Sequence, residues 1–171
     1  MEPTGSAYLY ALAGVSVTFV GFAALLLSFR QARGEPMTRY EGYFLLAFVQ
    51  SGFIVTGGAL LPPVLALCGL SAPAVWRVSG GIMAVPILVF VATLPGRRRA
   101  ATSAPTPRYV QVLSLCQLAI ALYLASNVIG AWTAAGVGPY VAAMTGLFFS
   151  VVIAYIIALN AAFAEPPKTS G

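Results

Sequence analysis

Long apolar runs separated by short polar breaks dominate the chain. The runs cover residues 7–29, 43–61, 74–94, 109–132 and 140–163. Each is close to the roughly 20 apolar residues that a helix needs to span a bilayer. The pattern therefore predicts an all-α protein in which a single domain, residues 1–171, is an integral membrane bundle of five transmembrane helices.

Prolines and arginines mark where these runs stop. A proline inside a helix removes a backbone donor and clashes with the preceding turn, so Pro62-Pro63 are expected to end the second helix at Leu61. The basic run Arg97–Arg99 follows Gly96 and is expected to end the third helix. Residues 95–108 would then form a basic loop, and residues 164–171 a polar tail.

The arginines are distributed unequally among the predicted loops. They fall in the first connection, at Arg30, Arg33 and Arg39, and in the third, at Arg97, Arg98, Arg99 and Arg108. The second and fourth connections, residues 62–73 and 133–139, hold neither Lys nor Arg. Short loops rich in Lys and Arg face the cytoplasm. The N-terminus is therefore predicted outside, and the 95–108 loop and the C-terminus in the cytoplasm.

The composition also points to a bilayer as the main partner of the chain. Hydrophobic residues make up 60% of the sequence and charged residues only 8%, against about 25% charged residues in soluble domains. The net charge of +5 suggests nucleic-acid binding at first sight. A nucleic-acid-binding protein needs a soluble basic face, however, and these arginines instead follow the loop bias of a membrane protein.

The residue types that the chain lacks exclude several kinds of chemistry. It contains no His and no Asp, and its acidic residues are Glu2, Glu35, Glu41 and Glu165. Haem ligation by His and a Ser-His-Asp triad are excluded, and no cluster of His, Asp, Glu or Cys is present for zinc or iron. The single lysine, Lys168, lies in the tail. We therefore expect a non-enzymatic protein with no metal and no cofactor.

Uncharged polar residues of the predicted spans fall into two layers. Gln50, Gln117 and Tyr155 lie about 10–12 Å from the cytoplasmic ends of their helices at 1.5 Å per residue. Ser79, Ser126 and Asn127 lie toward the outer side, with Arg77. Such side chains either bond across helices as structural contacts or line a path for a small solute.

Two charged residues are candidate functional residues. Arg77 lies about one turn into the third span. It either extends its guanidinium to the headgroups or faces the bundle, where a charge is a functional hypothesis by default. Because Ser79 lies near it on the same helix and Asn127 at a neighbouring depth, we expect the second position, with Arg77 bonding Asn127 or backbone carbonyls. Glu41, at the start of the second span near Arg39, is expected to be an interfacial ion-pair partner, with a gating or proton-linked role as the alternative.

A ridge of small residues follows one face of the fifth span. Its members are four residues apart and therefore share a helix face: Ala142, Gly146, Ser150, Ala154, Ala158 and Ala162. Small residues at this spacing let another helix approach closely. The partner is either a helix of the same chain or a second subunit. Gly80 and Ala84 form a shorter ridge of this kind on the third span.

The first 100 residues or so carry a resemblance to a known group of proteins. The matching residues are Thr18–Ala23, Arg30, Leu61-Pro62, Gly69-Leu70, Trp76-Arg77 with Ser79, and the basic loop Arg97–Arg99. Their order resembles that of an uncharacterised group of small bacterial multi-pass membrane proteins. The resemblance implies the bacterial inner membrane as the location and implies no activity.

Three functions are compatible with these features. The first is a non-enzymatic subunit that packs against itself, as a homo-oligomer, or against a larger membrane complex and supports its assembly. The second is an oligomeric channel or small-solute carrier with Arg77 and Asn127 near its outer side. The third is a lipid-modifying membrane enzyme. It is the least favoured, because an enzyme places several titratable groups in one pocket.

Overall fold

The computed structural model describes residues 5–32, 34, 39–128 and 136–163. Within these ranges the chain forms five helices and no strand: α1 Ser6–Ala32, α2 Arg39–Leu67, α3 Ala72–Ala101, α4 Arg108–Val128 and α5 Val137–Phe163. Each contains a segment that is long and apolar enough to cross a membrane. The predicted all-α membrane bundle of five spans is confirmed; its orientation in the membrane stays a prediction.

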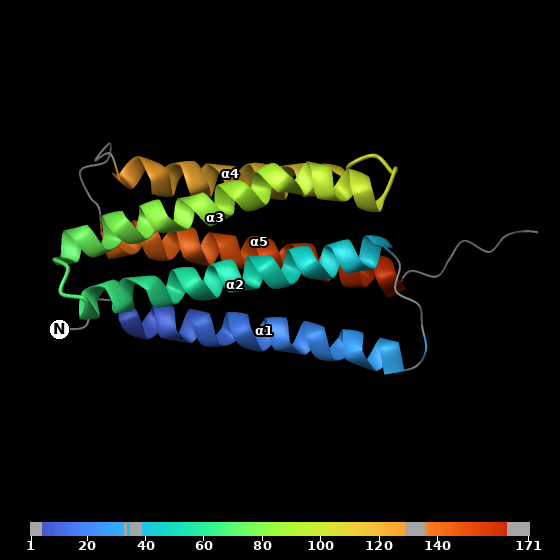
Figure 1. Cartoon of the computed structure of the whole chain (residues 1–171), viewed down its shortest axis with the longest axis horizontal. Helices are drawn as coiled ribbons and strands as arrows, with labels where there is room; N and C mark the ends of the chain where they lie inside the picture. Colours follow the sequence, from blue (N-terminus) through green and yellow to red (C-terminus); the bar gives the residue numbers. More distant parts are fainter. Residues whose placement is uncertain (1–4, 33, 35–38, 129–135, 164–171) are drawn as a thin grey trace, which may run out of the picture.

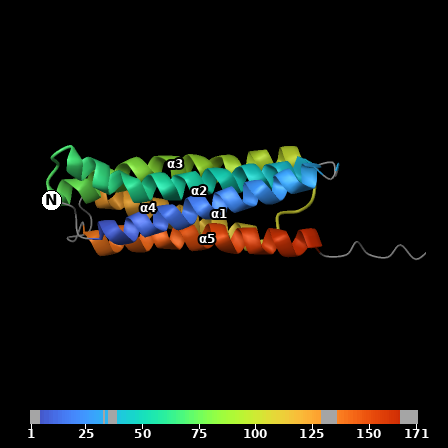
Figure 2. The ribbon, with the colours of Figure 1, turned by 90° about the horizontal axis from the view of Figure 1, so that it is seen from below.

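Helices α2, α3, α4 and α5 form a ring, and α1 lies outside it. Neighbours pack in the order α2, α3, α4 and α5, and α5 closes the ring against α2. The first helix, α1, packs mainly on α2 and only slightly on α5. The helices alternate in direction (Figure 1), and α1 runs obliquely across one side of the ring (Figure 2). The space enclosed by α2–α5 is therefore the place where a site inside the bundle can form.

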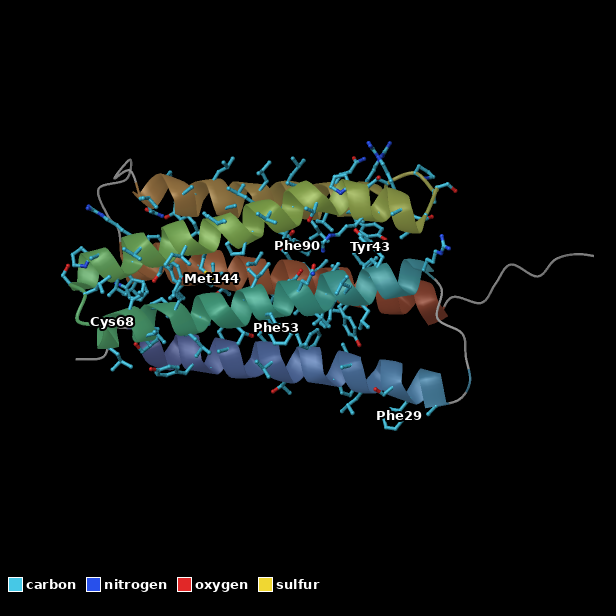
Figure 3. The ribbon with its side chains drawn as sticks, viewed as in Figure 1. Phe29, Tyr43, Phe53, Cys68, Phe90 and Met144 are labelled. Atoms are coloured by element: carbon cyan, nitrogen blue, oxygen red, sulfur yellow. The ribbon has the colours of Figure 1, made fainter. Side chains whose placement is uncertain are left out.

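The alternating direction brings most of the positive charges of the described chain to one end. The start of α2 carries Arg39, the end of α3 carries Arg97–Arg99, and the start of α4 carries Arg108. We call this the basic end, which lies at the right in Figure 1. The opposite end carries the α2–α3 connection with Cys68, as Figure 3 shows, and we call it the Cys68 end.

Apolar side chains fill the ring between its middle and the Cys68 end. Val55, Ile87, Leu124 and Met144, one from each ring helix, are each less than 2% exposed. Close helix packing here depends on Gly80, because a Cβ atom at this position would lie only 3.1 Å from the carbonyl oxygen of Leu124. The short ridge predicted on the third span thus faces α4.

The second helix extends beyond its predicted end. It continues through Pro62 and Pro63 to Leu67, so the expected end at Leu61 is wrong. Pro62 has no N–H, so the carbonyl of Gly58, four residues earlier, loses its helical partner. The hydroxyl of Tyr140 in α5 donates a hydrogen bond of 2.7 Å to that carbonyl. A neighbouring helix therefore satisfies the group that the proline leaves free, as membrane bundles allow.

The third helix also extends beyond its predicted end. It contains Pro95 and all three arginines and ends at Ala101, so the expectation that residues 95–108 form a loop holds only for residues 102–107. Arginine is a good helix former, and positive charge near a helix C-terminus is favourable. A helix of 30 residues is about 45 Å long. This exceeds a hydrocarbon core of roughly 30 Å, so α3 is long enough to bring its basic last turns to the headgroup level.

The remaining helix ends need only small corrections. The first helix begins at Ser6 and the fifth at Val137, close to the predicted starts at 7 and 140. The fourth ends at Val128, while its predicted end at 132 and the polar tail of residues 164–171 lie outside the described residues.

The hydrogen bond from Tyr140 to Gly58 gives a test of this packing. Tyr140→Phe leaves the Gly58 carbonyl buried without a partner, a loss of about 1–3 kcal/mol. Pro62→Ala returns an N–H to the helix, so the same Tyr140→Phe change should cost less in that background. Unfolding of the four variants, by SDS titration in mixed micelles, measures this coupling. An equal loss in both backgrounds would contradict our explanation of the Pro62 site.

Candidate functional site

A cavity of about 80 Å³ lies inside the ring toward the basic end. All four ring helices contribute to its wall. Most of the wall is apolar, and it includes five aromatic side chains: Tyr43, Phe44, Phe48, Phe90 and Tyr109. Figure 3 shows Tyr43 and Phe90 where α2 and α3 face each other. We call this cavity the Arg98 chamber, after the one charged residue among the described residues of its wall.

Arg98 is buried although it belongs to the basic end. Only 5% of its surface is exposed, because the last turns of α3 direct it into the ring. Its Nη2 atom donates hydrogen bonds to the carbonyl oxygens of Pro105, at 2.8 Å, and Ala104, at 3.3 Å, in the α3–α4 loop. Its Nε and Nη1 atoms are buried and have no hydrogen-bond partner. Two of the three guanidinium nitrogens are therefore free to bind an acceptor.

This arrangement is unfavourable while the chamber holds no acceptor. An arginine side chain stays charged in proteins and has only donors. Removing such a charge from water costs several kcal/mol unless a partner compensates it. The described residues of the chamber wall include no Asp or Glu, and the two loop carbonyls are neutral acceptors. The free donors of Arg98 are the strongest unsatisfied polar feature in the described part of the chain.

The neighbouring arginine differs from Arg98 in its surroundings. Arg97 is partly buried, and its Nη1 atom donates a hydrogen bond to Oε1 of Gln50 in α2. Gln50 was predicted to lie in the polar layer near the cytoplasmic side, and the structure uses it to join α2 to α3. Arg99, the third of the run, is exposed. Three consecutive arginines thus have three different surroundings, which their common sequence context does not reveal.

The other two members of that predicted layer lie in and behind the chamber wall. Gln117 is 6% exposed and lines the chamber. Tyr155 lies behind Phe48, with their ring centroids 4.7 Å apart. Its hydroxyl is buried without a hydrogen-bond partner. The structure therefore brings Gln117, but neither Gln50 nor Tyr155, to the same cavity as Arg98.

Two serines of the wall are already satisfied by their own helices. The hydroxyl of Ser51 donates to the carbonyl of Ala47 at 2.7 Å, and that of Ser114 donates to the carbonyl of Val110 at 2.8 Å. The oxygen atoms of these hydroxyls can still accept a hydrogen bond, but their protons are already donated to the helix carbonyls. Apart from the two tyrosines, Arg98 and Gln117 are therefore the described wall residues that can donate hydrogen bonds to a ligand without first breaking one of the bonds given above.

The predicted outer layer does not form a site around Arg77. The side chain of Arg77 is exposed, so the expectation that it faces the bundle is wrong. Asn127 is 7% exposed and donates to the carbonyl of Tyr123 at 3.1 Å. Ser126 bonds to the same carbonyl at 2.7 Å, and Ser79 is fully buried. These polar side chains are distributed between the surface and the α3–α4 contact, and they do not surround a common space.

The small-residue ridge of α5 lies partly against α4. A Cβ atom on Gly146 would lie 3.4 Å from Cδ1 of Ile120, an ordinary contact distance, and Ser150 is 7% exposed. Ala142 is exposed and Ala154 lines the chamber. The side chains of Ala158 and Ala162 lie outside the described residues. Part of the ridge therefore packs inside the chain.

Glu41 lies in the first turn of α2, and its side chain lies outside the described residues. Its predicted role as an ion-pair partner or gating residue stays a prediction.

Sequence reasoning did not select Arg98 as a site residue. Three consecutive arginines before a loop are typical of a cytoplasmic helix end, and that pattern gave all three the same interpretation. A signal was nevertheless present. Phe90, Leu94 and Arg98 are four residues apart and therefore share one helix face. Because this face points into the ring, an arginine on it is buried.

Comparisons with models of protein families, with curated proteins and with solved structures find no match to this chain.

The exposure of Arg77 changes the expected result of its substitution. Lysine also brings a cation to the headgroup level on a long apolar stem, so Arg77→Lys should melt at the wild-type temperature in lipid nanodiscs. The matched change Arg98→Lys should lower the melting temperature, because lysine does not reproduce the planar set of guanidinium donors. A lower melting temperature for Arg77→Lys than for Arg98→Lys would contradict this assignment.

Proposed function

We propose that this multi-pass membrane protein is a non-enzymatic binding protein that holds one small ligand in the Arg98 chamber. The observation that carries the proposal is the buried guanidinium of Arg98, whose Nε and Nη1 atoms have no partner and which lines a cavity between four helices. Ligand sites are concave, mostly apolar and equipped with a few placed polar groups. The chamber has each of these properties.

The filling of the ring favours binding over conduction through one chain. On the Cys68 side of the chamber, Val55, Ile87, Leu124 and Met144 are each less than 2% exposed and occupy the space between the helices. A ligand in the chamber would therefore enter and leave near the basic end. The predicted oligomeric channel or carrier with Arg77 and Asn127 near its outer side stays a prediction, because Arg77 is exposed on the single chain and could line a path only between subunits.

The wall chemistry favours a protein without catalytic activity. Acid–base catalysis uses His, Glu, Asp, Lys, Tyr or Cys side chains. Of these residue types, the described part of the chamber wall contains only Tyr43 and Tyr109. Both tyrosines take part in interactions with other residues. A guanidinium and a glutamine amide bind and orient a ligand, and these two tyrosines are the only acid–base side chains among the described wall residues.

The bacterial inner membrane is part of this proposal, as the resemblance of the first 100 residues implies. A role as an interaction or assembly subunit, in a homo-oligomer or a larger complex, is compatible with ligand binding. It stays a prediction, because Gly146 and Ser150 of the α5 ridge pack within the chain.

Native mass spectrometry of the purified protein tests ligand binding. The wild type, extracted from its membrane in maltoside detergent, should carry one small bound molecule per chain. Ala154→Phe places a ring in the chamber wall and should remove that mass. Ala142→Phe is the matched control, because Ala142 is exposed on the same helix, and it should retain the bound molecule. A wild type without bound mass, or equal retention in both variants, would contradict the proposal.

A further inference from the structure

The donors of Arg98 and the wall around them restrict the chemistry of the ligand. A guanidinium offers only N–H groups, and two of its nitrogens here have no partner. We propose that the chamber binds the oxyanion head group, a carboxylate or a phosphate, of a molecule with an acyl chain, and that Arg98 is its anion-binding residue. This inference rests on the proposed binding function and adds the class of ligand.

The charge of Arg98 explains why the head group should be an anion. Hydrogen bonds from a guanidinium to a carboxylate or phosphate are about twice as strong as those between neutral groups. The carbonyls of Ala104 and Pro105 bind only Nη2, and the part of the chamber wall that the structure describes contains no acidic residue. A ligand oxyanion on Nε or Nη1 would supply both the missing acceptor and the missing negative charge. A neutral ligand would leave that charge uncompensated.

The apolar wall explains why the anion should carry an acyl chain. Rings such as Phe44 and Phe90 and aliphatic side chains such as Leu113 and Val151 make up most of the lining. A free phosphate ion would lose its hydration against these groups and would gain only the Arg98 donors and the Gln117 amide. A cavity of about 80 Å³ is also several times the roughly 10–15 Å³ that one water molecule needs by this kind of measure. It has room for a head group and its first carbon atoms.

The position of the chamber suits a molecule that already lies in the membrane. Arg98 is in the last turn of α3, near the headgroup level, whereas the apolar wall residue Phe90 lies eight residues earlier in the same helix, about 12 Å along it. An amphiphile at the bilayer surface has its charged group at the first depth and its apolar chain at the second. The chamber therefore matches the polarity of such a molecule along the membrane normal.

Thermal melting in maltoside with added oleate or oleyl alcohol distinguishes the contribution of the anionic group to binding from that of the hydrocarbon chain. The two probes have the same hydrocarbon chain, and only oleate carries a negative charge. Oleate should raise the melting temperature of the wild type in a saturable manner, and dioleoyl phosphatidic acid should do the same. Oleyl alcohol, dioleoyl phosphatidylcholine and inorganic phosphate should have little effect at the same concentrations.

Arg98→Gln and Arg99→Gln form the matched pair of variants. They remove the same charge from adjacent positions, one buried and one exposed. Arg98→Gln should weaken oleate binding by about tenfold or more, as expected for a lost charged hydrogen bond, and Arg99→Gln should not. Equal oleate shifts in both variants would overturn the inference and leave Arg98 with only its contacts to the loop. If Arg98→Gln does not fold, Arg98→Lys and Arg99→Lys form the pair, because lysine keeps the charge but does not reproduce the planar guanidinium donors, and only Arg98→Lys should weaken oleate binding.

The probes also distinguish failure of the inference from failure of the proposed function. Equal stabilisation by oleate and oleyl alcohol would overturn the inference that the ligand is an anion. The proposal that the chamber binds a ligand would still stand. Stabilisation by inorganic phosphate alone would overturn the inference that the ligand has an acyl chain and would indicate a free anion as the ligand. If the wild type responds to no probe and carries no bound mass after purification, both proposals fail. The comparison of oleate with oleyl alcohol uses the wild type alone, so it tests whether the ligand is an anion even if every Arg98 variant unfolds.

Discussion

Every polar group within the hydrocarbon must find its partner in the protein, because lipid offers none, and this constraint governs most of the structure. Serine and threonine side chains meet it locally: Thr93 and Ser150, for example, donate to carbonyls four residues earlier. At Pro62 the helix cannot meet the constraint alone, and Tyr140 of the adjacent helix α5 donates a hydrogen bond to the carbonyl of Gly58. The long α2, with two prolines inside it, depends on that contact with α5.

Arg98 is the charged residue, among those the structure describes, for which the chain does not meet this constraint by itself. Its Nη2 atom is bound by loop carbonyls, but Nε and Nη1 are buried without a partner, and the chamber beside them is open for a ligand. Arg97, one residue earlier, shows the alternative, because its Nη1 atom has a partner in Gln50. The contrast between these neighbours separates an arginine that joins two helices from one with two unsatisfied nitrogens. The proposed function rests on the unsatisfied member of the pair.

The sequence was sufficient to predict the fold class but not the site, for physical reasons. The lengths of the apolar runs follow from bilayer thickness, so the five spans could be predicted. The ends of α2 and α3 could not, because their continuation depends on contacts between helices, such as the bond from Tyr140 to Gly58. Gln117 was selected because a polar residue within a span is unusual. Arg98 was not, because whether an arginine near a helix end faces lipid or the ring depends on how the helix is rotated. The same dependence made the expectation for Arg77 wrong.

A crystal structure of the wild type grown in a lipid mesophase containing oleate tests the central claim most directly. Our account predicts a carboxylate at roughly 2.7–2.9 Å from Nε or Nη1 of Arg98, the usual range for such charged hydrogen bonds, with its chain against Phe44 and Phe90. A structure in which Nε and Nη1 are instead bound by a carboxylate of the chain itself, such as Glu41, would contradict the account, because Arg98 would then be satisfied without a ligand.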